Sequence, residues 1–289
     1  MPTPNVTNVI QPSGLPIGVA LGTIGVPFAW WRDSARRLEV AGYSGVWCWD
    51  HFTTRGSRPN TVLEAWTTLT AVAAVTDRLT VGTFVANVMN RHPAVLARMA
   101  ATLHEVSGGR LVLGIGIGGH PAEHHAYGIP FPDVTERVTR LEAAVAVIRA
   151  LWSGGPITQD SPFYPLRDAV ALAAPEPRPP IVVGGQSATG ARLAARIGDG
   201  WTTRPDLLDR LLPVYEESLA AAGRARADTT VIVGWEGGRA GEDALAGSPW
   251  IAAPVEEWHR WRERGADGVV VLARTNADVD ALVHAAERW

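Results

Sequence analysis

The sequence predicts an α/β fold in which residues 1–289 form a single domain, a closed (β/α)8 TIM barrel. Eight short apolar runs of strand length recur along the chain, and nearly all of them are followed by a segment with helical character. Repeated strand–helix units form parallel sheets with right-handed crossovers. Eight such units favour a closed barrel over an open doubly wound sheet, which is the structural alternative.

The expected elements alternate with short connections throughout the chain. Strands are expected at 17–21, 45–49, 79–85, 110–115, 180–183, 200–202, 230–235 and 268–272. Helices are expected at 30–40, 61–75, 93–105, 134–152, 192–196, 207–222, 255–264 and 277–289. We expect two insertions in the barrel: a longer connection after the fourth strand, at 116–133, and an excursion before the fifth, at 154–180, with a small hairpin.

Composition excludes several classes of function. The net charge is −3, so no basic surface for nucleic acid is expected. All 26 basic residues are arginine, which excludes a catalytic lysine and a Schiff base. The only cysteine, Cys48, excludes a disulfide within the chain and a cysteine zinc site. A polar N-terminus and the lack of any run of ~18 apolar residues predict a cytoplasmic protein without a membrane partner.

The loops that follow barrel strands are where active sites of this architecture lie. After the second strand, Asp50 stands beside His51. Imidazole titrates near neutral pH, and a nearby carboxylate fixes its orientation, so this pair suits proton transfer. After the third strand, Asn87, Asn90 and Arg91 could contact the polar atoms of a ring.

Two glycine-rich loops follow the fourth and fifth strands. Gly114, Gly116 and Gly119 satisfy the spacing G-x-G-x-x-G, but no second strand ends in an acidic residue about 20 positions later, so a Rossmann site is not expected. Gly184–Gly185 leads into a helix that begins near Ser187. Free N–H groups at a helix start favour phosphate, so these two loops together predict a phosphate site.

The string His120-Pro-Ala-Glu123-His124 matches the H-x-x-E-H pattern of inverted zinc peptidases. Pro121 between the histidines suits only a helix start, and a peptidase has no use for the preceding glycine loop. We therefore expect no metal here.

Four stretches in order resemble one known family: AGYSGVWCWDHF, RLTVGTFVANVMNRHPAVLARMAATLHEVSGGRLVLGIGIGG, YGIPFPDVTERVTRLEAAVAVIRALWSGG and PPIVVGGQSATGARLAARIGDGW. Between about residues 41 and 202 the chain resembles the bacterial-luciferase-like monooxygenase superfamily, in particular its deazaflavin (coenzyme F420)-dependent branch. The resemblance implies a barrel that binds the cofactor at its strand ends and performs a two-electron reaction.

The resemblance also implies roles for individual residues. His51 would move a proton, with Asp50 setting its charge and orientation, and a non-proline cis peptide would join Phe84 and Val85. The implied cofactor contacts are Asp50, His51, Phe84, Val85, Ala86, Asn87, Gly116, Ile117, Gly118, Gly119, Gly184, Gly185 and Gln186. Two departures, Gly119 in place of a glutamate and Arg55 in place of a tryptophan, argue against the sugar-phosphate substrate of some members.

The sequence therefore predicts an oxidoreductase that transfers a hydride between coenzyme F420 and a small organic substrate. Two alternatives stay open: an FMN-dependent luciferase-like monooxygenase, and a non-catalytic flavin-binding accessory protein. A homodimer is expected, as is a separate flavin or F420 reductase as a partner. The expected substrate pocket is formed by Phe52, Arg55, His120, His124, Tyr127 and Trp235.

Overall fold

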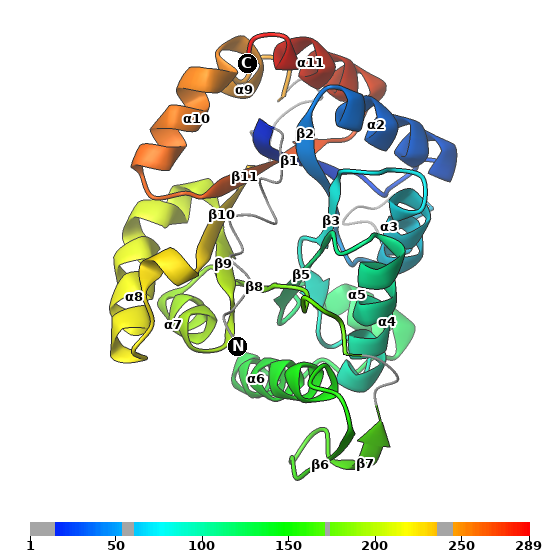
Figure 1. Cartoon of the computed structure of the whole chain (residues 1–289), viewed down its shortest axis with the longest axis vertical. Coiled ribbons are helices and arrows are strands. Elements are labelled where there is room, and N and C mark those ends of the chain that lie inside the picture. The colour runs from blue at the N-terminus through cyan, green and yellow to red at the C-terminus, as the bar shows by residue number, and fades with distance from the viewer. Residues whose placement is uncertain (1–14, 54–60, 171–173, 236–244) are drawn as a thin grey trace.

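The computed structural model describes residues 15–53, 61–170, 174–235 and 245–289, and its central sheet closes into a barrel (Figure 1). The barrel strands are β1 (Leu15–Leu21), β2 (Tyr43–Cys48), β3 (Thr80–Thr83), β5 (Leu111–Gly116), β8 (Ile181–Gly184), β9 (Gly200–Thr203), β10 (Thr230–Trp235) and β11 (Gly268–Ala273). All pair in parallel, and the β3–β5 pairing closes the ring. The predicted (β/α)8 barrel and each of its eight strands are confirmed.

A short strand extends the third barrel strand. After β3 the chain passes through Phe84 and Val85, and β4 (Ala86–Asn87) then pairs with the C-terminal end of β5. The peptide bond between Phe84 and Val85 is cis, as the resemblance implied. This arrangement brings Asn87 to the same end of the barrel as the loop that follows β5.

Helices surround the barrel (Figure 1). They are α2 (Phe28–Val40), α3 (Ala65–Ala73), α4 (Pro93–Val106), α5 (Pro121–Tyr127), α6 (Val134–Leu151), α7 (Ala188–Ile197), α8 (Leu208–Ala221), α9 (Pro249–Ala252), α10 (Pro254–Glu263) and α11 (Asn276–Ala286), with 3-10 turns at Pro205–Leu207 and Arg226–Asp228. Polar side chains cap the N-termini of several helices: Asp133 caps α6, and Thr275 forms a capping box with Asp278 at α11.

Two differences from the expected helices have local causes. Helix α3 is shorter than predicted because Val62 forms an isolated bridge with Ile24, and the Glu64 side chain then caps the helix by accepting from the Thr67 N–H. The connection after β5 contains α5, a helix that the sequence analysis did not identify. Pro121 opens it and Gly128, with a φ of 65°, ends it.

The excursion before the fifth barrel strand forms the expected hairpin. Strands β6 (Pro156–Gln159) and β7 (Leu166–Val170) pair antiparallel and project beyond the ring of helices (Figure 1). Tyr164 in its turn is buried, and the Arg140 guanidinium lies 4.7 Å from the ring of Phe163. These contacts attach the hairpin to α6.

The barrel interior is filled by side chains. The inward-facing cluster consists of Ala20, Trp47, Val112, Val182, Ile232, Val270 and Leu272. Trp47 is the largest member, and glycines on both neighbouring strands make room for it, because a Cβ at Gly18 or Gly82 would overlap the indole. Phe84 packs edge-on against Trp47 at 5.7 Å. The barrel is therefore a packed core, and a ligand can approach only at its ends.

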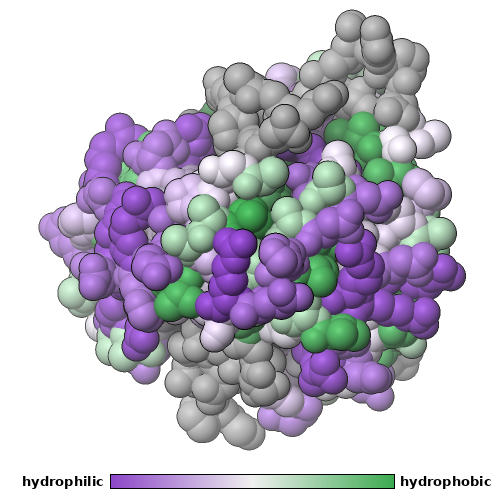
Figure 2. All heavy atoms as spheres, turned by 90° about the horizontal axis from the view of Figure 1, so that it is seen from above, coloured by the Kyte–Doolittle hydropathy of each residue, from purple (hydrophilic) through white to green (hydrophobic). Residues whose placement is uncertain are grey.

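The surface is mainly polar in the view of Figure 2, where apolar residues are scattered among hydrophilic ones. Exposed large apolar side chains such as Val40, Val95 and Val134 lie on three different helices. Among the residues that the structure describes, none of the helices combines the length and apolar character needed to cross a membrane.

The glycines of the fourth-strand loop provide a stability test. A Cβ at Gly114 would overlap the carbonyl oxygen of Thr83, whereas a Cβ at Gly119 would meet nothing within 4 Å. We expect Gly114→Ala to lower the free energy of unfolding by about 1–3 kcal/mol, as overpacked sites do. Gly119→Ala, the matched control, should change it by less than about 0.5 kcal/mol. Urea denaturation of the two variants measures both values, and equal effects would contradict the packing.

Candidate active site

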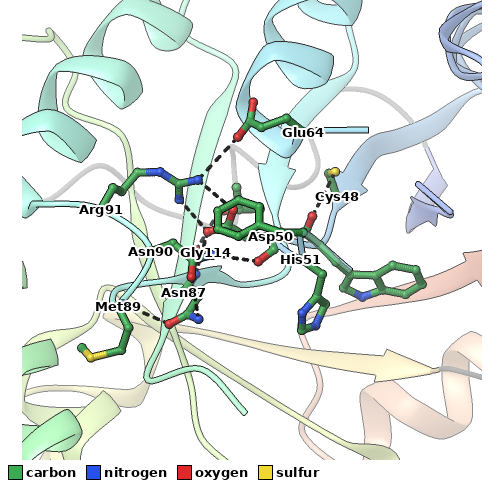
Figure 3. Close-up of polar contacts among 12 residues, drawn as sticks. Cys48, Asp50, His51, Glu64, Asn87, Met89, Asn90, Arg91 and Gly114 are labelled. Carbon is green, nitrogen blue, oxygen red and sulfur yellow. Dashed lines mark hydrogen bonds and ion pairs between the residues drawn. The ribbon is translucent and has the colours of Figure 1, made fainter. Parts of the chain in front are cut away.

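Asp50 anchors the loop that follows β2. Its buried carboxylate accepts two hydrogen bonds from the Arg91 guanidinium, at 2.6 and 2.9 Å, and one from the Asn87 backbone N–H, at 2.9 Å (Figure 3). Arg91 also lies 3.4 Å from Glu64 and against the ring of Trp66. Asp50 thus ties together the loops after β2 and β3 through a bidentate ion pair.

His51 has a different carboxylate partner from the one expected. Its imidazole extends away from the Asp50–Arg91 pair (Figure 3). The His51 Nδ1 atom lies 3.3 Å from Oε1 of Glu123, which is 72 residues further along the chain, on α5. The structure shows no hydrogen bond between Asp50 and His51, although Asp50 was expected to orient the imidazole; the Asp50 oxygens accept from Arg91 and Asn87.

Glu123 is held in place by the backbone of the loop after β2. Its other oxygen, Oε2, accepts from the N–H groups of Phe52, at 2.7 Å, and Thr53, at 3.0 Å, and the side chain is 1% exposed. Burial by itself raises the pKa of Glu123. The two N–H groups and the nearby His51 more than offset burial, so the pKa lies below its ordinary value. Glu123 is therefore an anion at neutral pH.

Three metal-capable side chains converge at this point. Ligand atoms of His51, His120 and Glu123 lie within 4.8 Å of one another, and the two rings meet edge to face at 5.8 Å. Two imidazoles and a carboxylate form a ligand set that zinc accepts. Both Glu123 oxygens, however, already accept hydrogen bonds from protein donors.

The second histidine of the H-x-x-E-H string does not join this group. His124 is buried, its Nε2 atom lies 2.8 Å from the Asn87 amide nitrogen, and its ring packs on Phe131 at 4.4 Å. Burial, together with nearby Arg137, keeps the pKa of His124 below its ordinary value despite the adjacent Glu123. His124 therefore supports Asn87 instead of forming a wall of the substrate pocket as expected.

Packing accounts for most of the glycines that the sequence analysis assigned to a ligand. A Cβ at Gly116 or Gly184 would lie 2.8 or 3.2 Å from Val85, the residue after the cis peptide bond. Gly118 has a φ of 74°, and a Cβ there would lie 2.5 Å from the Asn87 side chain. Of these positions only Gly119 faces open space.

The same end of the barrel carries a helix start suited to an anion, close to the loop after β5. Arg137 donates to the carbonyl oxygens of Ile117 and Gly118, at 3.1 and 2.8 Å, and so fixes the conformation of the loop after β5. At the start of α7, the Ser187 side chain accepts from the Gly190 N–H. Gln186, just before this helix start, is exposed. The helix dipole favours negative charge at this point.

The structure places three of the six expected substrate residues, Phe52, His120 and Tyr127, around His51. The rings of Phe52 and Tyr127 lie 5.4 Å apart, and the Tyr127 hydroxyl donates to the Phe52 carbonyl oxygen at 3.3 Å. His120 adjoins both His51 and Glu123. Trp235 is partly buried at the C-terminal end of β10. Arg55, which was also expected in the substrate pocket, lies outside the described residues.

Sequence comparison assigns the chain to a family. The family described as luciferase-like monooxygenase matches residues 15–236. The chain belongs to the luciferase-like monooxygenase family. This match covers all the barrel strands from β1 to β10, including the loops that carry Asp50, His51 and Glu123.

Several curated relatives are about one third identical to this family member over the matched region. The F420-dependent glucose-6-phosphate dehydrogenase of Microbacterium testaceum is 34% identical over 205 residues, which are 68% of this chain and 60% of that protein. The F420-dependent hydroxymycolic acid dehydrogenase of Mycobacterium tuberculosis is 32% identical over 236 residues, 81% of this chain and 63% of that protein. The matches therefore span about three fifths of these relatives' length.

Solved structures confirm the fold. An F420-dependent secondary alcohol dehydrogenase in complex with an F420–acetone adduct superposes with a TM-score of 0.81 at 21% identity, covering 93% of this chain and 96% of that one. The coenzyme F420-dependent tetrahydromethanopterin reductase from Methanopyrus kandleri gives a TM-score of 0.76 at 18% identity, covering 95% and 98%.

The Asp50–Arg91 pair makes a testable contribution to stability. The Asp50 side chain is 1% exposed and that of Arg91 is 12% exposed, so Arg91→Ala leaves a buried charge without its partner. We expect a loss of about 3–5 kcal/mol in the free energy of unfolding. Arg167→Ala is the matched control, because its partner Asp160 is 92% exposed, and it should cost less than about 1 kcal/mol. Guanidinium denaturation measures both, and similar losses would contradict the anchoring role.

Proposed function

We propose that this chain is an oxidoreductase that binds coenzyme F420 and transfers a hydride between it and a small organic substrate. Two independent observations support the proposal. Curated relatives at about a third identity are named as F420-dependent dehydrogenases. The observation that carries the proposal is the grouping of three features at one end of the barrel: His51, a bulge at Phe84–Val85 and the helix start of α7. The bulge arises because the chain between Gly82 and Ala86 holds one residue more than the facing stretch of β5.

The residues present fit such a cofactor. Phe84 covers the packed interior of the barrel through its contact with Trp47, so a flat ring would rest on Phe84 and Val85 beside His51. The phosphate-bearing tail would lie along the loop from Gly116 to Gly119 and the start of α7 at Gly184–Gln186, where Gly119 and Gln186 are exposed. When bound, the deazaflavin supplies the two-electron donor or acceptor.

His51 provides the accompanying proton. Reduction of a carbonyl group by hydride requires one proton at the oxygen, and oxidation of an alcohol releases one, so the chemistry needs an acid–base group at the barrel mouth. The His51 side chain is 31% exposed and therefore accessible to a substrate. In this proposal Asp50 acts through Asn87 and Arg91, by fixing the loop that adjoins the ring.

The substrate that suits these surroundings is uncharged. Phe52, Tyr127 and Trp235 offer apolar aromatic surface. This favours a small alcohol or carbonyl compound over a sugar phosphate. The homodimer, the cytoplasmic location and a separate reductase are further proposals, which rest on the family resemblance and the soluble composition.

Cofactor binding and turnover test the proposal separately. Titration of the protein with F420 should change the cofactor's fluorescence, whereas FMN, the matched control, should bind more weakly. His51→Asn should retain F420 binding but lower kcat by about 10²–10⁴-fold, the usual contribution of general acid–base catalysis. Tight FMN binding with oxygen-dependent oxidation of reduced FMN would select the monooxygenase alternative instead.

A further inference from the structure

The Glu123–His51 contact has a defined direction. Ionised carboxylate oxygens only accept hydrogen bonds, so the His51 Nδ1 atom, 3.3 Å from Oε1, must be the donor. The nitrogen that carries the hydrogen in a neutral imidazole is set by the hydrogen bond that the ring makes. The contact with Glu123 therefore selects the Nδ1–H form of His51 and leaves Nε2 with its lone pair.

The neighbours of Glu123 leave it no freedom to turn. Oε2 is held by the N–H groups of Phe52 and Thr53, at 2.7 and 3.0 Å, and by the Thr53 hydroxyl at 3.4 Å. These donors fix which oxygen faces His51. Because the Phe52 and Thr53 groups belong to the same loop as His51, the carboxylate and the imidazole are placed by one short segment of chain.

The other charged and titratable groups nearby do not compete for Nδ1 of His51. Asp50 is paired with Arg91, and Asn87 donates to Nε2 of His124. His120 faces the opposite oxygen, with its Nδ1 atom 3.8 Å from Oε2 of Glu123, and that nitrogen has no hydrogen-bond partner among the described residues.

We propose that Glu123 is the positioning residue of the active site, which holds His51 as the Nδ1–H tautomer so that Nε2 exchanges the proton with the substrate. The role of Glu123 in turnover rests on the proposed function, whereas the tautomer of His51 follows from the contact alone. Glu123 is a member of the H-x-x-E-H string, and this assignment gives the string a use other than zinc binding.

The variant Glu123→Gln tests the proposal with little change in shape. The glutamine oxygen should stay with the Phe52 and Thr53 N–H groups, because they need an acceptor, and its NH2 group should then face His51. An amide NH2 group only donates, so Nδ1 of His51 must accept and the hydrogen must move to Nε2. Nitrogen-15 NMR of labelled histidines, in protein without cofactor above the titration range of histidine, reports the tautomer.

We expect the Nδ1–H form of His51 in the wild-type protein and the Nε2–H form in Glu123→Gln, with the signal assigned through its loss in His51→Asn. Glu142→Gln, which alters an exposed glutamate paired with Arg196, is the matched control and should leave the tautomer unchanged. His120→Asn should also leave it unchanged. A wild-type Nε2–H form, or no change in Glu123→Gln, would overturn the proposal, even if F420 turnover is observed.

Turnover supplies the second readout. A histidine in the wrong tautomer cannot accept a proton at Nε2, so Glu123→Gln should lower kcat by about 10²–10⁴-fold with a smaller effect on KM. If the wild-type protein shows no F420-dependent turnover, the result would contradict the proposed function but not the tautomer assignment. Histidine signals of His51 and His120 that report bound Zn²⁺, and change on treatment with EDTA, would overturn the positioning role in favour of a metal site.

Discussion

The bidentate pair between Asp50 and Arg91 is the interaction on which the candidate site depends. It joins the ends of two neighbouring barrel strands and also holds the Asn87 N–H group, so the bulge at Phe84–Val85 is fixed from one side. The contacts of this carboxylate are with Arg91 and Asn87, and the carboxylate that contacts His51 is that of Glu123. Anchoring of the loops and contact with His51 are therefore divided between two acidic residues, Asp50 and Glu123, which come from opposite sides of the third barrel strand.

Close packing explains the glycines better than ligand binding alone. Val85 projects towards the fourth and fifth barrel strands, and Gly114, Gly116 and Gly184 accommodate it and the neighbouring carbonyl group. Packing around this bulge therefore accounts for Gly114 and Gly116, two of the three glycines in the pattern that resembles a nucleotide-binding fingerprint. A ligand is not required to explain why these residues are glycines.

The barrel could be predicted from the sequence because its signal is local and repeated. Each of the eight apolar runs forms a strand, and the 134–152 stripe forms α6. Glu123, the partner of His51, could not be predicted in this way, because a contact between residues 72 positions apart produces no periodic pattern in the sequence. Adjacency in the sequence favoured Asp50, although side chains that follow one another after a strand point in different directions. One signal for Glu123 was present in the sequence: it stands near the start of a helix that Pro121 opens, directly after the glycine-rich loop.

The exclusive use of arginine has a consequence for how the molecule responds to acid and base. Every basic partner in the ion pairs among the described residues is an arginine or a histidine, and arginine keeps its charge at any pH at which the protein is folded. The arginine side chains of these ion pairs therefore do not change their charge with pH. Histidine is the other basic residue type in these ion pairs, and His51 and His120 meet beside Glu123 at one end of the barrel. The ion pairs that hold the barrel together, such as Asp50–Arg91 and Asp199–Arg149, use cations that do not lose their proton.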